Sequence, residues 1–124
     1  MDSVLLRYKI SDGSGLTTLY QNSTFTGPNE FLGLAVDTDG TTYAVGYITH
    51  TDLISTTAVG AVTSMWIGKF PPTGVAPIWT ATFNEGTGND QAISVSVSGS
   101  FVYVAAQGAI PGPKNRLRVF KFVK

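Results

Sequence analysis

The chain has 124 residues, a formal net charge of zero and no cysteine. This length is enough for one domain with a buried core. The missing thiols exclude disulfides, zinc–thiolate sites and cysteine nucleophiles, and the low net charge disfavours nucleic-acid binding. No stretch is long and apolar enough to span a membrane, and the first residues do not begin a signal peptide. The few charges and frequent Gly, Ser and Thr suit an extracellular or cell-surface β protein.

Nine short segments have the alternating or continuous β-prone pattern of strands. Gly-, Asp- and Asn-rich stretches separate them and predict turns. No segment is assigned to a helix, because Gly, Pro and Thr interrupt each candidate window. In chain order, the predicted strands are residues 4–10, 16–25, 31–36, 42–49, 64–70, 77–83, 91–97, 101–107 and 117–123.

These segments form a repeat. The best copy is residues 79–108, in which an alternating strand, a turn, a second alternating strand and a continuous apolar run follow one another. The same parts occur in the same order in residues 24–47, so that Tyr43 and Tyr103 lie in matching strands. Four short strands in a unit of this length fit propeller blades better than solenoid turns.

The repeat resembles that of the "β-propeller repeat" (SBBP) family. Three parts of the chain carry the resemblance: the stretch 79–97, the inner strand, glycine turn and second strand in 34–47, and the third strand and following turn in 66–74. The resemblance implies an all-β fold of four-stranded antiparallel propeller-type blades, about two per chain. It implies no particular activity.

The predicted organisation is a single propeller-like domain with a partial blade (1–25), a blade (31–83) and an incomplete blade (91–124). A closed propeller needs several blades, and an open one leaves strand edges that template another chain. We therefore expect either self-association, head-to-tail into a ring or filament, or a longer parent chain. The charges agree with a head-to-tail contact, because the first half of the chain is acidic and the second half basic.

The edge strands at the two ends of the chain are the predicted assembly sites. The basic residues near the C-terminus are expected to protect an edge or dock on an acidic neighbour, rather than to bind nucleic acid. The predicted assembly residues are Leu5, Arg7 and Tyr8 in the first strand and Arg118, Phe120 and Phe122 in the last.

The long, apolar and Thr-rich loop after residue 47 is a candidate ligand or contact loop. Its candidate residues are His50, Asp52, Leu53 and Ile54. His50 is the only histidine and could pair with Asp52, but no nucleophile or oxyanion site accompanies them. We therefore expect no enzyme activity, no catalytic residue and no cofactor.

Two further patterns admit a bland and a functional interpretation. The segment 37–40 resembles the start of a calcium loop but lacks the later ligands, so that a hairpin turn is favoured and no metal is expected. Large aromatic residues recur at matching positions of the repeat, which favours packing between blades. The alternative is a carbohydrate-binding, lectin-like module with a glycan partner.

Overall fold

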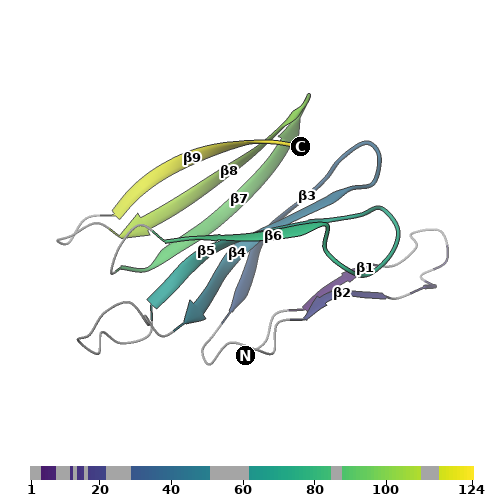
Figure 1. The fold of residues 1–124 in the computed structure, drawn as a ribbon, viewed down its shortest axis with the longest axis horizontal. Coiled ribbons are helices and arrows are strands. Elements are labelled where there is room, and N and C mark those ends of the chain that lie inside the picture. Colours follow the sequence, from purple (N-terminus) through teal and green to yellow (C-terminus); the bar gives the residue numbers. More distant parts are fainter. Residues whose placement is uncertain are drawn as a thin grey trace.

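The computed structural model describes residues 4–7, 12, 14–15, 17–21, 29–50, 62–84, 88–109 and 115–124. The described part contains nine antiparallel strands and no helix (Figure 1), which confirms the predicted all-β class. Each strand overlaps a predicted one, but residues 77 and 78 precede β6, and residues 8–10, 16 and 22–25 of the predicted strands lie outside the described part. The strands are β1 (Val4–Arg7), β2 (Thr17–Gln21), β3 (Glu30–Val36), β4 (Thr42–His50), β5 (Val62–Phe70), β6 (Trp79–Phe83), β7 (Asp90–Ser98), β8 (Phe101–Ala109) and β9 (Asn115–Val123).

The strands form three separate sheets with the orders β1-β2, β3-β4-β5-β6 and β7-β8-β9. Within each sheet every strand pairs with the next one along the chain, so that each sheet is a simple meander. None of these sheets closes on itself among the described strands. The turn between β3 and β4 is the predicted hairpin turn: Gly40 has a φ of 86°, and the Asp39 carboxylate accepts the Thr41 N–H at 2.8 Å.

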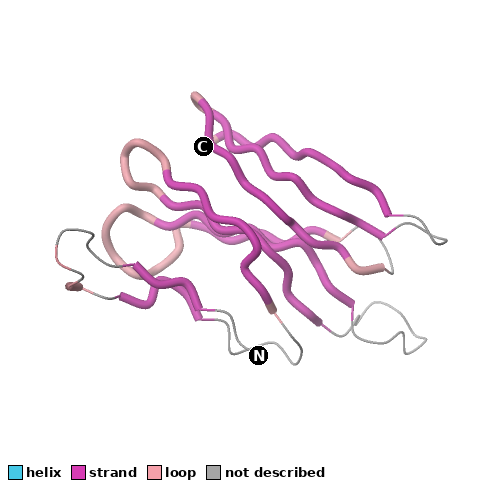
Figure 2. Tube along the Cα trace, turned by 180° about the vertical axis from the view of Figure 1, so that it is seen from behind, coloured by secondary structure: helices cyan, strands magenta, loops and turns pink. Residues whose placement is uncertain are grey.

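The three sheets stack face to face, with the four-stranded sheet in the middle (Figures 1 and 2). Side chains alternate along a strand, so that β4 and β5 supply apolar groups to both faces. One face packs against β7–β9 and the other against β1. The first cluster contains Tyr43, Val45, Met65, Ile67, Ala92, Val95, Val102, Val104 and Ala106, and the second contains Leu5, Ala44, Ile48, Trp66 and Phe70.

Polar contacts also join the middle sheet to the three-stranded sheet. Lys124, directly after β9, forms an ion pair with Asp37 in the hairpin turn of the middle sheet. Thr63 on β5 donates its hydroxyl to the Asp90 carbonyl of β7 at 3.2 Å. These contacts complement the apolar packing between the two sheets.

The strands of the middle sheet and those of the three-stranded sheet pair in the same register within their own sheets. Tyr43 pairs with Lys69 in the middle sheet, as Tyr103 pairs with Lys121 in the other. Both inner strands also carry a register shift at matching places, after Phe31 in β3 and after Ala92 in β7. The sequence repeat is therefore a repeat of strand pairing, and it sets up a residue-by-residue correspondence between the two sheets.

Gly33 allows β3 and β7 to approach closely. A Cβ atom at this position would lie 2.9 Å from Val45 Cγ2, 3.0 Å from Ser94 Cα and 3.2 Å from the Ile93 carbonyl oxygen. Two of these three neighbours are backbone atoms, which cannot rotate away as a side chain can. A larger residue therefore requires the two strands to move apart.

We expect Gly33→Ala to lower the free energy of unfolding by about 1–3 kcal/mol, because overpacking shifts the backbone of β7. Urea denaturation measures this change. The neighbouring Leu32, which is 40% exposed, supplies the control: Leu32→Ala should change stability by only about 0.5 kcal/mol. Equal losses in the two variants would contradict a close approach at Gly33.

Candidate assembly surfaces

Strand β1 presents two different faces. Leu5 is buried against the middle sheet, whereas Val4 and Leu6 are 45% and 48% exposed. Because neighbouring residues of a strand point to opposite sides, Val4 and Leu6 lie on the side turned away from the middle sheet. We call these two residues the rear face. It is a small apolar surface at one end of the stack.

Arg7 fastens β1 to the middle sheet. Its guanidinium donates hydrogen bonds to the carbonyl oxygens of Pro71 at 2.8 Å, Pro72 at 2.8 Å and Gly74 at 2.6 Å. All three acceptors belong to the loop between β5 and β6, and a planar group with several N–H donors can reach them together. Arg7 therefore acts within the chain, through side-chain bonds to a backbone loop.

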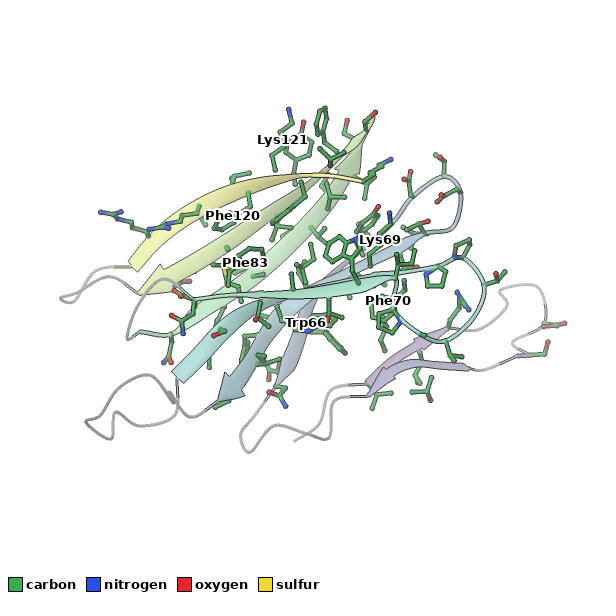
Figure 3. The ribbon with its side chains drawn as sticks, in the orientation of Figure 1. Trp66, Lys69, Phe70, Phe83, Phe120 and Lys121 are labelled. Atoms are coloured by element: carbon green, nitrogen blue, oxygen red, sulfur yellow. The ribbon has the colours of Figure 1, made fainter. Side chains whose placement is uncertain are left out.

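The opposite end of the stack is the outer face of the sheet β7–β9. Leu117, Val119 and Val123 of β9 are 76%, 69% and 74% exposed. Between them Lys121 places its ammonium group 3.7 Å from the centre of the Phe101 ring, and Figure 3 shows this lysine on the side away from the middle sheet. We call this surface the front face; its residues are Phe101, Tyr103, Leu117, Val119, Lys121 and Val123.

The front face corresponds to a surface that is buried elsewhere in the chain. Val119 pairs with Ala105 as Ile67 pairs with Val45, so that Val119 and Ile67 occupy matching positions. Ile67 is 2% exposed because the three-stranded sheet covers it, whereas Val119 is 69% exposed. The same register matches Leu117, which is exposed, to Met65, which is 3% exposed.

A third apolar surface lies on β3. Leu34 and Val36 are 56% and 61% exposed. Their counterparts on β7 are Val95, which is 9% exposed, and Val97, which packs against the first cluster. The difference arises because β7 faces the middle sheet, whereas the two-stranded sheet β1–β2 packs against another part of the middle sheet.

The predicted residues of the last strand take different places. Phe120 and Phe122 point toward the middle sheet, where the rings of Phe83 and Phe120 stack with centroids 6.2 Å apart (Figure 3). Arg118 is half-buried. The structure thus brings Phe120 and Phe122 into the packing between two sheets of one chain, and a role for them in assembly stays a prediction.

Sequence reasoning missed the exposed residues next to these. Val4, Leu6, Leu117 and Val119 alternate with the predicted assembly residues and lie on the free faces of their strands. The period-two pattern could have separated the two sets. It could not say which set faces inward, because each set contains large apolar residues.

The candidate loop lies mostly outside the described residues. His50 is the last residue of β4, and its backbone pairs with Val62 at the start of β5. Asp52, Leu53 and Ile54 fall in the segment 51–61, which lies outside the described part. Tyr8, a predicted residue of the first edge strand, also lies outside the described part. Their proposed roles stay predictions.

Two ionisable groups near the hairpin turn of the middle sheet have shifted pKa values with simple causes. A hydrogen bond from Lys124, together with the Thr38 N–H, lowers the pKa of Asp37. Burial, with smaller effects of Asp37 and Asp39, raises the pKa of the Tyr43 hydroxyl. Within the described ranges, no three His, Cys, Asp or Glu residues are close enough together to hold a metal ion, and no helix could cross a membrane.

Comparison of the chain with protein-family models, curated protein sequences and solved structures finds no match. The exposed surfaces and the strand edges of the chain therefore carry the evidence for its function.

We expect Arg7→Lys to loosen the sheet β1–β2 and to cost about 1 kcal/mol, because a lysine ammonium cannot span three carbonyl acceptors as the guanidinium does. Hydrogen exchange of residues 4–7 measures the loosening. The exposed Arg116 gives a matched control, since Arg116→Lys should leave exchange in β1 unchanged. Unaltered protection of β1 in Arg7→Lys would show that the three hydrogen bonds do not hold this sheet.

The Asp37–Lys124 ion pair predicts a pH dependence of stability. Since the folded state lowers the pKa of Asp37 below its usual 3.8, the pair stabilises the fold above that pH, and the effect is lost as the pH falls through the folded-state pKa. Thermal melting of the wild type and Asp37→Asn should differ at neutral pH and converge in acid. A difference in melting temperature that stayed constant from neutral to acid pH would refute this assignment.

Proposed function

We propose that the chain is a structural and interaction module of propeller-type blades that assembles with copies of itself, head to tail, into a ring or filament. The observation that carries this proposal is the edge of β9. Strand β5 pairs with β4 on one side and with β6 on the other. Its counterpart β9 pairs with β8, and no second strand pairs with it among the described residues.

An open edge invites strand addition. A strand with unpaired backbone N–H and C=O groups is a template for another strand, which can supply the missing hydrogen bonds. A strand from a second copy, placed as β6 is placed beside β5, would complete a sheet of four. The rear and front faces support assembly in the same way, since each is apolar and exposed at an end of the stack.

The arrangement of sheets supports the propeller part of the proposal. Meander sheets of up to four strands pack face to face, and their inner strands β3 and β7 lie close together at Gly33. Propeller blades share this packing of neighbouring sheets and the consecutive strand order. We further propose an extracellular or cell-surface location, supported only by the Ser-, Thr- and Gly-rich composition.

A carbohydrate-binding function has less support. Sugar rings stack on exposed aromatic faces. Phe83 is 37% exposed, and Phe101 and Tyr103 of the front face are half-buried. The large aromatic residues Tyr43, Trp66 and Phe70, in contrast, are at most 3% exposed. Their rings fill the space between sheets, as the packing interpretation of the sequence requires. Self-association is therefore the function that we put forward.

The proposal is tested by light scattering combined with hydrogen exchange at several protein concentrations. We expect the mean mass to rise with concentration and the amides of β9 to gain protection in the associated state, because a new strand would pair with its open edge. Strand β5, which is paired on both sides, is the internal control and should show no change. A single monomer mass at every concentration would overturn the proposed function.

A further inference from the structure

We propose that the front face of one chain binds the rear face of a second copy, with Leu6 of the second copy packed against Leu117 and Val119 of the first. This inference rests on the proposed function and specifies the surfaces by which two copies meet. The occupant is a second copy because the chain already contains an equivalent contact between two of its own sheets.

The internal contact is the packing of β9 on the middle sheet. Phe120 projects from β9 toward β5 and lines a small cavity together with Met65 and Ile67. Met65 and Ile67 are 3% and 2% exposed in this contact. An apolar residue of β9 thus packs on two apolar residues of β5, the strand at the corresponding place in the middle sheet.

Both partners of that contact have exposed counterparts. Leu117 and Val119 match Met65 and Ile67 by register, because they pair with residues of β8 as Met65 and Ile67 pair with residues of β4. The counterpart of Phe120 is Leu6, because Leu6 directly precedes the cation Arg7 as Phe120 directly precedes the cation Lys121. Leu6 also lies, like Phe120, on the strand face opposite to the cation that follows it.

The distribution of apolar groups on the front face fits a narrow partner. Most of its apolar residues lie on β8 and β9. On β7 the same side of the sheet carries the exposed residues Ser94 and Ser96, and Ile93, at the register shift next to them, is 39% exposed. A two-stranded sheet such as β1–β2 can cover the apolar strands and leave the serines in water. A partner that spanned the full sheet would instead bury these hydroxyls at a cost.

The charges favour a head-to-tail contact over a symmetric one. Two front faces placed together would bring two Lys121 ammonium groups into one apolar contact, which is unfavourable. The rear face consists of Val4 and Leu6, and the cation of β1, Arg7, points to the other side and is held by the loop between β5 and β6. A heterologous contact of this kind can repeat from copy to copy.

Three single variants of the full chain test the inference. Val119→Glu disables the front face and Leu6→Glu the rear face, and both original side chains are well exposed, so that the fold should tolerate the changes. Val75→Glu is the matched control, since Val75 is 55% exposed but belongs to neither face. Sedimentation velocity should show self-association weakened about tenfold or more by the first two changes and unaltered by Val75→Glu.

Mixing gives the decisive readout. Val119→Glu keeps an intact rear face and Leu6→Glu an intact front face, so that an equimolar mixture should form a one-to-one complex that grows no further. Wild-type protein that stays monomeric would overturn the proposed function together with this inference. Wild-type association that survives either variant, or a mixture without the complex, would overturn this inference alone. If circular dichroism shows that a glutamate variant has lost its fold, the milder Val119→Thr and Leu6→Ser are judged by the same mixing result.

Discussion

The burial of apolar side chains on both faces of the middle sheet is the constraint on which the rest of the structure depends. Strands β4 and β5 alternate between the two clusters: Val45 and Ile67 point to one side, and Ala44 and Trp66 to the other. Fully burying a large apolar side chain contributes about 1.5–3 kcal/mol, so that neither face of this sheet can be left in water without a large loss. One neighbouring sheet on each side is the minimum solution, and the chain supplies both.

The two outer sheets also have apolar residues on both faces, but each has a neighbouring sheet on one face alone among the described strands. A strand whose pattern is apolar on both sides needs a neighbour on both sides. The three-stranded sheet covers Ile67, whereas no sheet within the described part of the chain covers Val119 at the matching position of β9. The narrow sheet β1–β2 produces a related effect, because it leaves Leu34 of β3 exposed while the matching Val95 of β7 is covered. The exposed apolar groups thus follow from how many strands each sheet contains and from its place in the stack.

The sequence predicted the parts of the structure that are encoded locally. Alternation and turn residues located all nine strands and the hairpin turn at Gly40, since both signals act over a few residues. The facing of the last strand could not be predicted in this way. Phe120 and Val119 are both apolar neighbours, and only the position of the middle sheet decides that Phe120 points inward. The role of Arg7 was also beyond sequence reasoning, because its three carbonyl acceptors belong to a loop far along the chain.

Arg7, Lys69 and Lys121 occupy corresponding places in three sheets, and their surroundings bear on how the stack continues. The Arg7 cation binds carbonyl oxygens of a loop in the neighbouring sheet, whereas Lys69, whose sheet is covered by the three-stranded sheet, lies 5.9 Å from the centre of the Tyr43 ring. Lys121 lies over the Phe101 ring in the same way as Lys69 over Tyr43, and an exposed ammonium can exchange such a contact for stronger oxygen acceptors. A sheet that covers the front face would therefore meet apolar groups on β9 and, among them, a cation that can bind loop carbonyls. Both features match what the middle sheet receives from β1.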